Sequence, residues 1–72
     1  MKLQNTLKES RLQKGLTQEA LAALVGVTRQ TIIAIEKEKF VPSVKLALEL
    51  AAALEMPIGS LFRLEHEQGA KR

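Results

Sequence analysis

The sequence predicts an all-α protein with one small helical domain. Helix-forming residues with apolar side chains at helical spacing fill most of its 72 residues, which leave room for one domain. Gly26 and the pair Met56-Pro57 interrupt these stretches. Thr17, Thr28 and Ser43 each precede a stretch, where a hydroxyl oxygen can accept a hydrogen bond from a free N–H of the first helical turn.

The composition excludes several classes of protein. There is no cysteine, hence no disulfide and no zinc finger, which fits the reducing cytoplasm where we expect the protein. Apolar runs are too short to span a membrane, and no apolar signal segment follows Lys2, so we expect no membrane partner. The net charge of +3 favours an anionic partner such as nucleic acid, although it also fits an ordinary solvated helical surface.

The first predicted helix covers residues 2–14. This stretch lacks glycine and proline, and Leu3, Leu7 and Arg11 lie on one helical stripe. Gly15 then ends the helix.

The next two predicted helices cover residues 18–25 and 29–37. Gly26 lies between them, where the left-handed conformation open to glycine suits the end of a helix. The apolar faces contain Leu21, Ala22 and Val25 in the first helix, and Ile32 and Ile35 in the second. Two short helices joined by a brief turn with glycine are typical of a helix-turn-helix.

The last two predicted helices cover residues 44–54 and 58–62. The longer one buries a stripe of Leu46, Ala47, Leu50, Ala51 and Leu54. Leu61 and Phe62 are expected to close the core, although with Leu64 they could instead form a dimer contact. We therefore expect a domain over residues 1–62 and a charged, frayed tail over residues 63–72.

The sequence offers little for catalysis. His66 lies between two glutamates and could bind a metal weakly, but a solvated tail is the favoured interpretation. There is no second histidine, no cysteine and no aspartate, so neither a catalytic triad nor a usual metal-ligand set can form. We expect no enzyme activity, no cofactor, no metal site and no small-molecule ligand.

The outward face of the helix over residues 29–37 suits the reading of DNA. Arg29 can bind guanine and Gln30 can bind adenine, each through two hydrogen bonds, and Ile33 or Ala34 can touch a thymine methyl group. Lys37 lies on the same face.

Other polar residues flank this face and suit phosphate oxygens: Gln18, Thr28, Thr31 and Lys39. Each has an ordinary structural explanation when taken alone, such as helix capping for Thr28. The arrangement of the set is what predicts DNA binding.

Several motifs then identify a family resemblance. Gly15-Leu16-Thr17-Gln18, Gly26-Val27-Thr28-Arg29-Gln30-Thr31-Ile32, Ala34-Ile35-Glu36 and Pro42-Ser43 occur at matching spacing over about residues 3–62. Together they resemble the Cro/CI-type (XRE) helix-turn-helix repressors.

This resemblance implies a five-helix, lambda-repressor-like fold that binds double-stranded DNA and regulates transcription. Its DNA-facing positions correspond to Gln18, Thr28, Arg29, Gln30, Thr31, Ala34 and Lys39. It also implies a salt bridge between Arg11 and Glu36 that orients the reading helix, with Gly26 supporting the turn. A homodimer would read a palindromic operator with half-sites about one helical turn, ~34 Å, apart.

The sequence departs from the family pattern after the third helix. The run Glu36-Lys37-Glu38-Lys39 has no glycine, so we expect the usual C-cap to be lost and Glu38 to lie near the phosphates. An alternative function is a protein-interaction module of the same fold, an antitoxin or anti-repressor partner with weak DNA binding. Exposed Leu12, Leu24 and Ile33 would favour that alternative.

Overall fold

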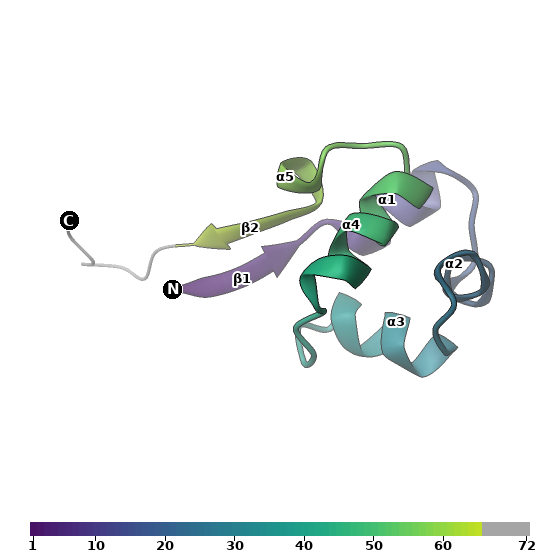
Figure 1. Ribbon diagram of the computed structural model, residues 1–72, viewed down its shortest axis with the longest axis horizontal. Helices are drawn as coiled ribbons and strands as arrows, with labels where there is room; N and C mark the ends of the chain where they lie inside the picture. Colours follow the sequence, from purple (N-terminus) through teal and green to yellow (C-terminus); the bar gives the residue numbers. More distant parts are fainter. Residues whose placement is uncertain (66–72) are drawn as a thin grey trace.

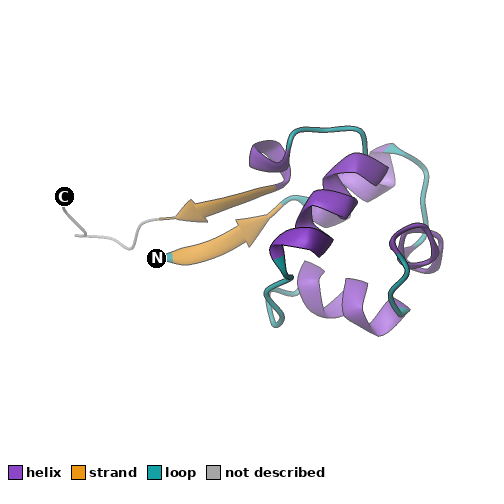
Figure 2. Ribbon diagram, viewed as in Figure 1, coloured by secondary structure: helices purple, strands orange, loops and turns teal. Residues whose placement is uncertain are grey.

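The computed structural model describes residues 1–65 and shows a body of five helices with a two-stranded ribbon extending from one side (Figures 1 and 2). In chain order the elements are β1 (Lys2–Asn5), α1 (Leu7–Gln13), α2 (Gln18–Val25), α3 (Arg29–Glu36), α4 (Val44–Ala53), α5 (Ile58–Leu61) and β2 (Phe62–Glu65). The longest helix in this part of the chain is too short to cross a bilayer.

The predicted caps position the central helices. Thr17 accepts a hydrogen bond from the Ala20 N–H, and Ser43 accepts one from the Leu46 N–H, each at 3.0 Å. Thr28 does the same for the Thr31 N–H at 3.3 Å, which sets the start of α3. Gly26 has a φ of 73°, the left-handed conformation that ends α2.

The core forms where the apolar stripes of the helices meet. Its largest fully buried side chains come from five different helices: Leu7, Leu21, Ile32, Ile35, Leu50 and Leu61. Half-buried Val27, in the turn between α2 and α3, and Phe62 pack against this cluster. Leu61 therefore closes the core as predicted, and Ile32 and Ile35 hold α3 against the body.

The N-terminal residues differ from the prediction. Residues 2–5 form β1 instead of the first turns of a helix, and α1 begins at Leu7. The Asn5 side-chain oxygen accepts a hydrogen bond from the Leu7 N–H at 3.0 Å, a local bond that starts the helix late. The Asn5 amide also donates to the Ile35 carbonyl at 2.9 Å, which ties the ribbon to α3.

The ribbon joins the two ends of the described chain. β1 pairs antiparallel with β2, with Leu3 opposite Leu64 and Gln4 opposite Arg63. Residues 63–65, which the sequence analysis placed in a frayed tail, thus belong to a strand. The rest of that tail, including His66, lies outside the described residues.

Candidate nucleic-acid interface

The N-terminal end of α3 is open to solvent. Arg29 and Gln30, its first two residues, are exposed, while Ile32 and Ile35 on the opposite face are buried. Thr28 ends the preceding turn and its hydroxyl lies 3.1 Å from the Thr31 hydroxyl. The core contacts of α3 thus leave its polar end facing outward.

The structure places the predicted site residues at two levels of exposure. Thr28, Arg29, Gln30, Lys37 and Lys39 are exposed, and Gln18, Thr31, Ile33 and Ala34 are half-buried. The half-buried group includes Ile33 and Ala34, the two apolar residues on the outward face of α3. Ile33 is therefore less exposed than the sequence analysis expected.

Three cations of α3 and the following turn remain available to a ligand. Within residues 1–65, no carboxylate forms an ion pair with Arg29, Lys37 or Lys39. By contrast, Lys14 and Lys45 on other helices are each paired with a glutamate. Arg29 lies at the N-terminal end of α3, and Lys37 and Lys39 lie at its C-terminal end. Unpaired cations at both ends of the helix suit an anionic partner.

A buried ion pair sets the position of α3 against α1. Arg11 donates from Nε to Glu36 Oε2 at 2.7 Å, and both side chains are almost fully buried, with 7% and 6% exposed. Arg11 Nη1 also donates to the Leu16 carbonyl at 2.8 Å, which fastens the loop before α2. The salt bridge implied by the family resemblance is thus confirmed.

Gln18 joins the same ion pair. Its side-chain Nε2 donates to Glu36 Oε1 at 3.1 Å, so the first residue of α2 is connected to the last residue of α3. The sequence analysis assigned Gln18 to phosphate contact and did not foresee this bond. Gln18 and Glu36 lie 18 positions apart, and no local sequence signal connects them.

Glu38 follows α3 in a left-handed conformation with a φ of 62°. The Glu38 N–H donates to the Ile35 carbonyl, and the Lys39 N–H donates to the Ala34 carbonyl, both at 2.9 Å. These two bonds form a Schellman C-cap. The expected loss of the C-cap is therefore wrong, because a glutamate occupies the position that usually contains glycine.

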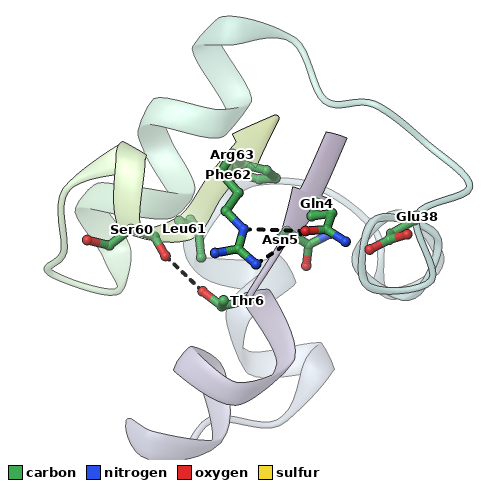
Figure 3. A pocket seen from close by; sticks show the side chains of 8 residues that line it. All are labelled: Gln4, Asn5, Thr6, Glu38, Ser60, Leu61, Phe62 and Arg63. Carbon is green, nitrogen blue, oxygen red and sulfur yellow. Dashed lines mark hydrogen bonds between the residues drawn. The ribbon is translucent and has the colours of Figure 1, made fainter. Parts of the chain in front are cut away.

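The Glu38 carboxylate also lies next to the ribbon. Lys2 Nζ is 3.3 Å from Glu38 Oε1. Figure 3 shows Glu38 at the edge of a cleft that Gln4 and Arg63 also line, where Arg63 donates to the Gln4 side-chain oxygen. The negative charge that was expected near the phosphates thus has a lysine partner.

Metal binding has no structural support in the described part of the chain. No group of three or more His, Asp or Glu side chains within residues 1–65 is placed to hold an ion.

Comparisons with known proteins agree with this geometry. A helix-turn-helix family model matches residues 7–61. The uncharacterised HTH-type transcriptional regulator YgzD of Bacillus subtilis (strain 168) is 48% identical over 65 residues, covering 90% of this chain and 98% of that protein. An uncharacterised HTH-type transcriptional regulator of Methanothermobacter thermautotrophicus is 50% identical over 70 residues, covering 96% and 100%. The solved structure of the restriction-modification controller protein C.AhdI from Aeromonas hydrophila is similar with a TM-score of 0.71 and 37% identity, covering 75% of this chain and 78% of that one.

Proposed function

We propose that this chain, which belongs to the Cro/CI-type helix-turn-helix family of transcriptional regulators, represses transcription by inserting α3 into the major groove of an operator. The observation that carries this proposal is the exposed N-terminal end of α3, where Arg29 and Gln30 face solvent. This is the end of a recognition helix that meets the base edges in helix-turn-helix complexes.

The proposed contacts divide by chemistry. Arg29 and Gln30 read bases, with Ile33 and Ala34 as apolar contacts to a thymine methyl group. Thr28, Thr31, Lys37 and Lys39 lie against phosphates and set the register of the protein on the duplex. The proposal includes no catalytic step and no cofactor, and it assigns the protein to the cytoplasm.

We further propose a homodimer on a palindromic operator. The ribbon supplies a candidate contact surface, because one of its faces is mostly apolar: Leu3 lies opposite Leu64, and Phe62 follows on the same side, opposite Asn5. Leu64 is 59% exposed as a residue, whereas Leu61 is buried and Phe62 is half-buried in the core. Of the dimer contacts suggested by the sequence, Leu64 is thus the one that remains open.

The alternative function, a protein-interaction module, has two exposed leucines in its favour, and the first of them, Leu12 of α1, is 57% exposed. Leu24 is 61% exposed and lines a shallow groove between α2 and α4 with Val25, Ala52 and Ala53. A partner helix could cover such a groove, and in that case DNA binding would be weak.

Binding to random duplex DNA over a salt series separates the two functions. A DNA reader loses affinity steeply with salt, because each neutralised phosphate releases counterions. Selection of bound sites from a random duplex pool then gives the operator and its symmetry. Weak binding without salt dependence, together with no selected sequence, would contradict the DNA-binding proposal and favour the alternative.

A further inference from the structure

The carboxylate of Glu38 is fixed close to the proposed phosphate contacts. Glu38 lies between Lys37 and Lys39 in the chain, so its Cα is about 3.8 Å from each of theirs. Its left-handed conformation and the hydrogen bond from its N–H to the Ile35 carbonyl hold the backbone in place. Exposed charges interact over about 10 Å at 0.1 M salt, so an unpaired carboxylate here would repel phosphates bound by the two lysines.

Lys2, the first residue of β1, brings a positive charge to this carboxylate. Its Nζ lies 3.3 Å from Glu38 Oε1, with 62% of the Lys2 side chain and 31% of the Glu38 side chain exposed. Lys2 lies opposite Glu65 in the ribbon, yet within residues 1–65 the carboxylate in ion-pair contact with it is that of Glu38. The ammonium group is thus directed at the end of α3 and not at its cross-strand neighbour.

The ribbon holds Lys2 in this place. Asn5, at the other end of β1, donates to a carbonyl in the last turn of α3 at 2.9 Å, so the strand is attached to that helix. Arg63 of β2 donates to the Gln4 side chain on the face of the ribbon that bears Lys2. Figure 3 shows Arg63 and Gln4 in the cleft whose edge Glu38 forms. The position of Lys2 therefore follows from the pairing of β1 with β2.

We infer that Lys2 is a positioning residue for DNA binding that acts through Glu38: its ammonium group neutralises the carboxylate and so allows Lys37 and Lys39 to approach the phosphates. This role rests on the proposed function. Lys37, Glu38 and Lys39 together carry a net charge of +1, which the paired Lys2 raises to +2. Phosphate contacts carry no sequence information, so Lys2 strengthens binding to every sequence alike.

A double-mutant cycle on Lys2 and Glu38 tests this role with random duplex DNA at low salt. Lys2→Gln should weaken binding roughly 2- to 5-fold, because the carboxylate then meets the phosphates without a partner. Glu38→Gln should bind as tightly as the wild type or more tightly. Lys2→Gln should cost clearly less in the Glu38→Gln background than it does alone. Base preferences at the selected operator should stay the same in all three variants.

Two other roles for Lys2 give different results in the same cycle. If Lys2 contacts a phosphate itself, Lys2→Gln weakens binding by the same factor with or without the Glu38 carboxylate. If the ion pair only fastens the ribbon, Glu38→Gln breaks it too and weakens binding as Lys2→Gln does. Either result overturns the inference and leaves the proposed function standing. A wild-type protein that binds DNA without salt dependence contradicts both.

Two further variants separate charge from side-chain loss. Lys2→Arg retains the positive charge and should bind as the wild type does. Lys8→Gln removes the same charge from an exposed lysine of α1, which has no ion-pair partner within residues 1–65. Any loss in Lys8→Gln should be the same with and without Glu38→Gln. A loss in Lys2→Arg as large as that in Lys2→Gln would exclude charge as the reason and overturn the inference.

Discussion

At the residue scale, the buried ion pair of Arg11 and Glu36 holds the helices of the helix-turn-helix together. Burying two charges costs desolvation free energy, so such a pair adds little net stability. Removing one partner leaves an unpaired buried charge and typically costs about 3–5 kcal/mol. The pair also connects α1, the loop at Leu16, Gln18 and the end of α3. We therefore interpret it as a device that orients the reading helix.

Arg29→Ala should weaken binding to the selected operator by about 1–3 kcal/mol and relax the preference at one base pair, because two hydrogen bonds to a guanine edge are lost. Lys39→Ala is the matched change at a proposed phosphate contact. It should weaken binding to all sequences alike and reduce the salt slope by about one. Dissociation constants for the operator and its single-base-pair variants measure both effects. Unchanged discrimination in Arg29→Ala would show that the base-reading end is misassigned.

The ion pair of Lys14 and Glu55 predicts a pH effect outside the DNA face. The hydrogen bond and the charge of Lys14 lower the pKa of Glu55 below 4.5. The pKa of Glu55 is lower in the folded state than in the unfolded state, so the ion pair stabilises the folded protein at pH values above the unfolded-state pKa. This stabilisation is lost as the pH falls through the folded-state pKa.

An NMR titration of the Glu55 carboxylate measures this shift. Lys14→Gln should return the pKa of Glu55 towards 4.5, and added salt should do so in part, since the pair is exposed. Lys45→Gln, which removes a lysine paired with Glu49, is the control and should leave the pKa of Glu55 unchanged. The same pKa in the Lys14→Gln protein would exclude Lys14 as its cause.

At the element scale, four helices end in the same way with different residues, and Gly15 follows α1 in the left-handed conformation with a φ of 71°. Gly26 follows α2 in the left-handed conformation, whereas Glu38 and Glu55 occupy that conformation after α3 and α4, with φ values of 62° and 57°. Each glutamate has a lysine partner, Lys2 or Lys14. The Schellman geometry thus forms without glycine, although a Cβ makes the conformation unfavourable.

Glu38→Gly should therefore be more stable than Glu38→Gln by about 1 kcal/mol in the free energy of unfolding. Both variants lose the ion pair to Lys2, so their difference isolates the cost of a side chain at positive φ. Chemical denaturation of the two variants side by side measures it. Equal stabilities would mean that the left-handed conformation at this position carries no cost.

Two leucines of α2 give a second comparison at this scale. Leu21 is fully buried and Leu24 is 61% exposed. Leu21→Ala should lower the free energy of unfolding by about 2–5 kcal/mol, because it leaves a cavity beneath α3. Leu24→Ala should change it by less than about 0.5 kcal/mol. Thermal unfolding of both variants checks this, and a large loss for Leu24→Ala would contradict the placement of the α2 face.

At the scale of the whole molecule, the ribbon gives the described chain its elongated shape, with extents of 40 × 21 × 21 Å. Figure 1 shows β1 and β2 leaving the helical body together. A two-stranded ribbon alone is marginally stable in water. Here Asn5 and Lys2 tie it to the C-terminal end of α3, at the Ile35 carbonyl and at Glu38. A partner on the apolar face of the ribbon would therefore lie on an element that contacts the reading helix.

The proposed homodimer predicts that Leu64→Lys shifts the sedimentation coefficient towards that of a monomer. A charge on the apolar face opposes its burial against a second copy. The variant should still bind a single half-site but lose tight binding to the palindrome. Gln4→Lys, on the polar face of the same ribbon, is the control and should remain dimeric. A Leu64→Lys dimer that keeps full operator affinity would place the interface elsewhere.

The sequence by itself determined the four central features of the helical body: the caps at Thr17, Thr28 and Ser43, and the turn at Gly26. These signals are local, since a hydroxyl caps a helix within three residues and glycine adopts positive φ wherever it stands. The apolar stripes likewise follow from helical spacing, which predicted the burial of Ile32 and Ile35 correctly.

Tertiary structure alone decided the ribbon and the orientation of Gln18. Residues 2–5 carry no strong strand signal, and their strand forms because residues about 60 positions later pair with them. The hydrogen bond from Gln18 to Glu36 likewise depends on α2 and α3 packing together. Both features require the chain to fold before the partners meet, so local propensity and spacing could not predict them.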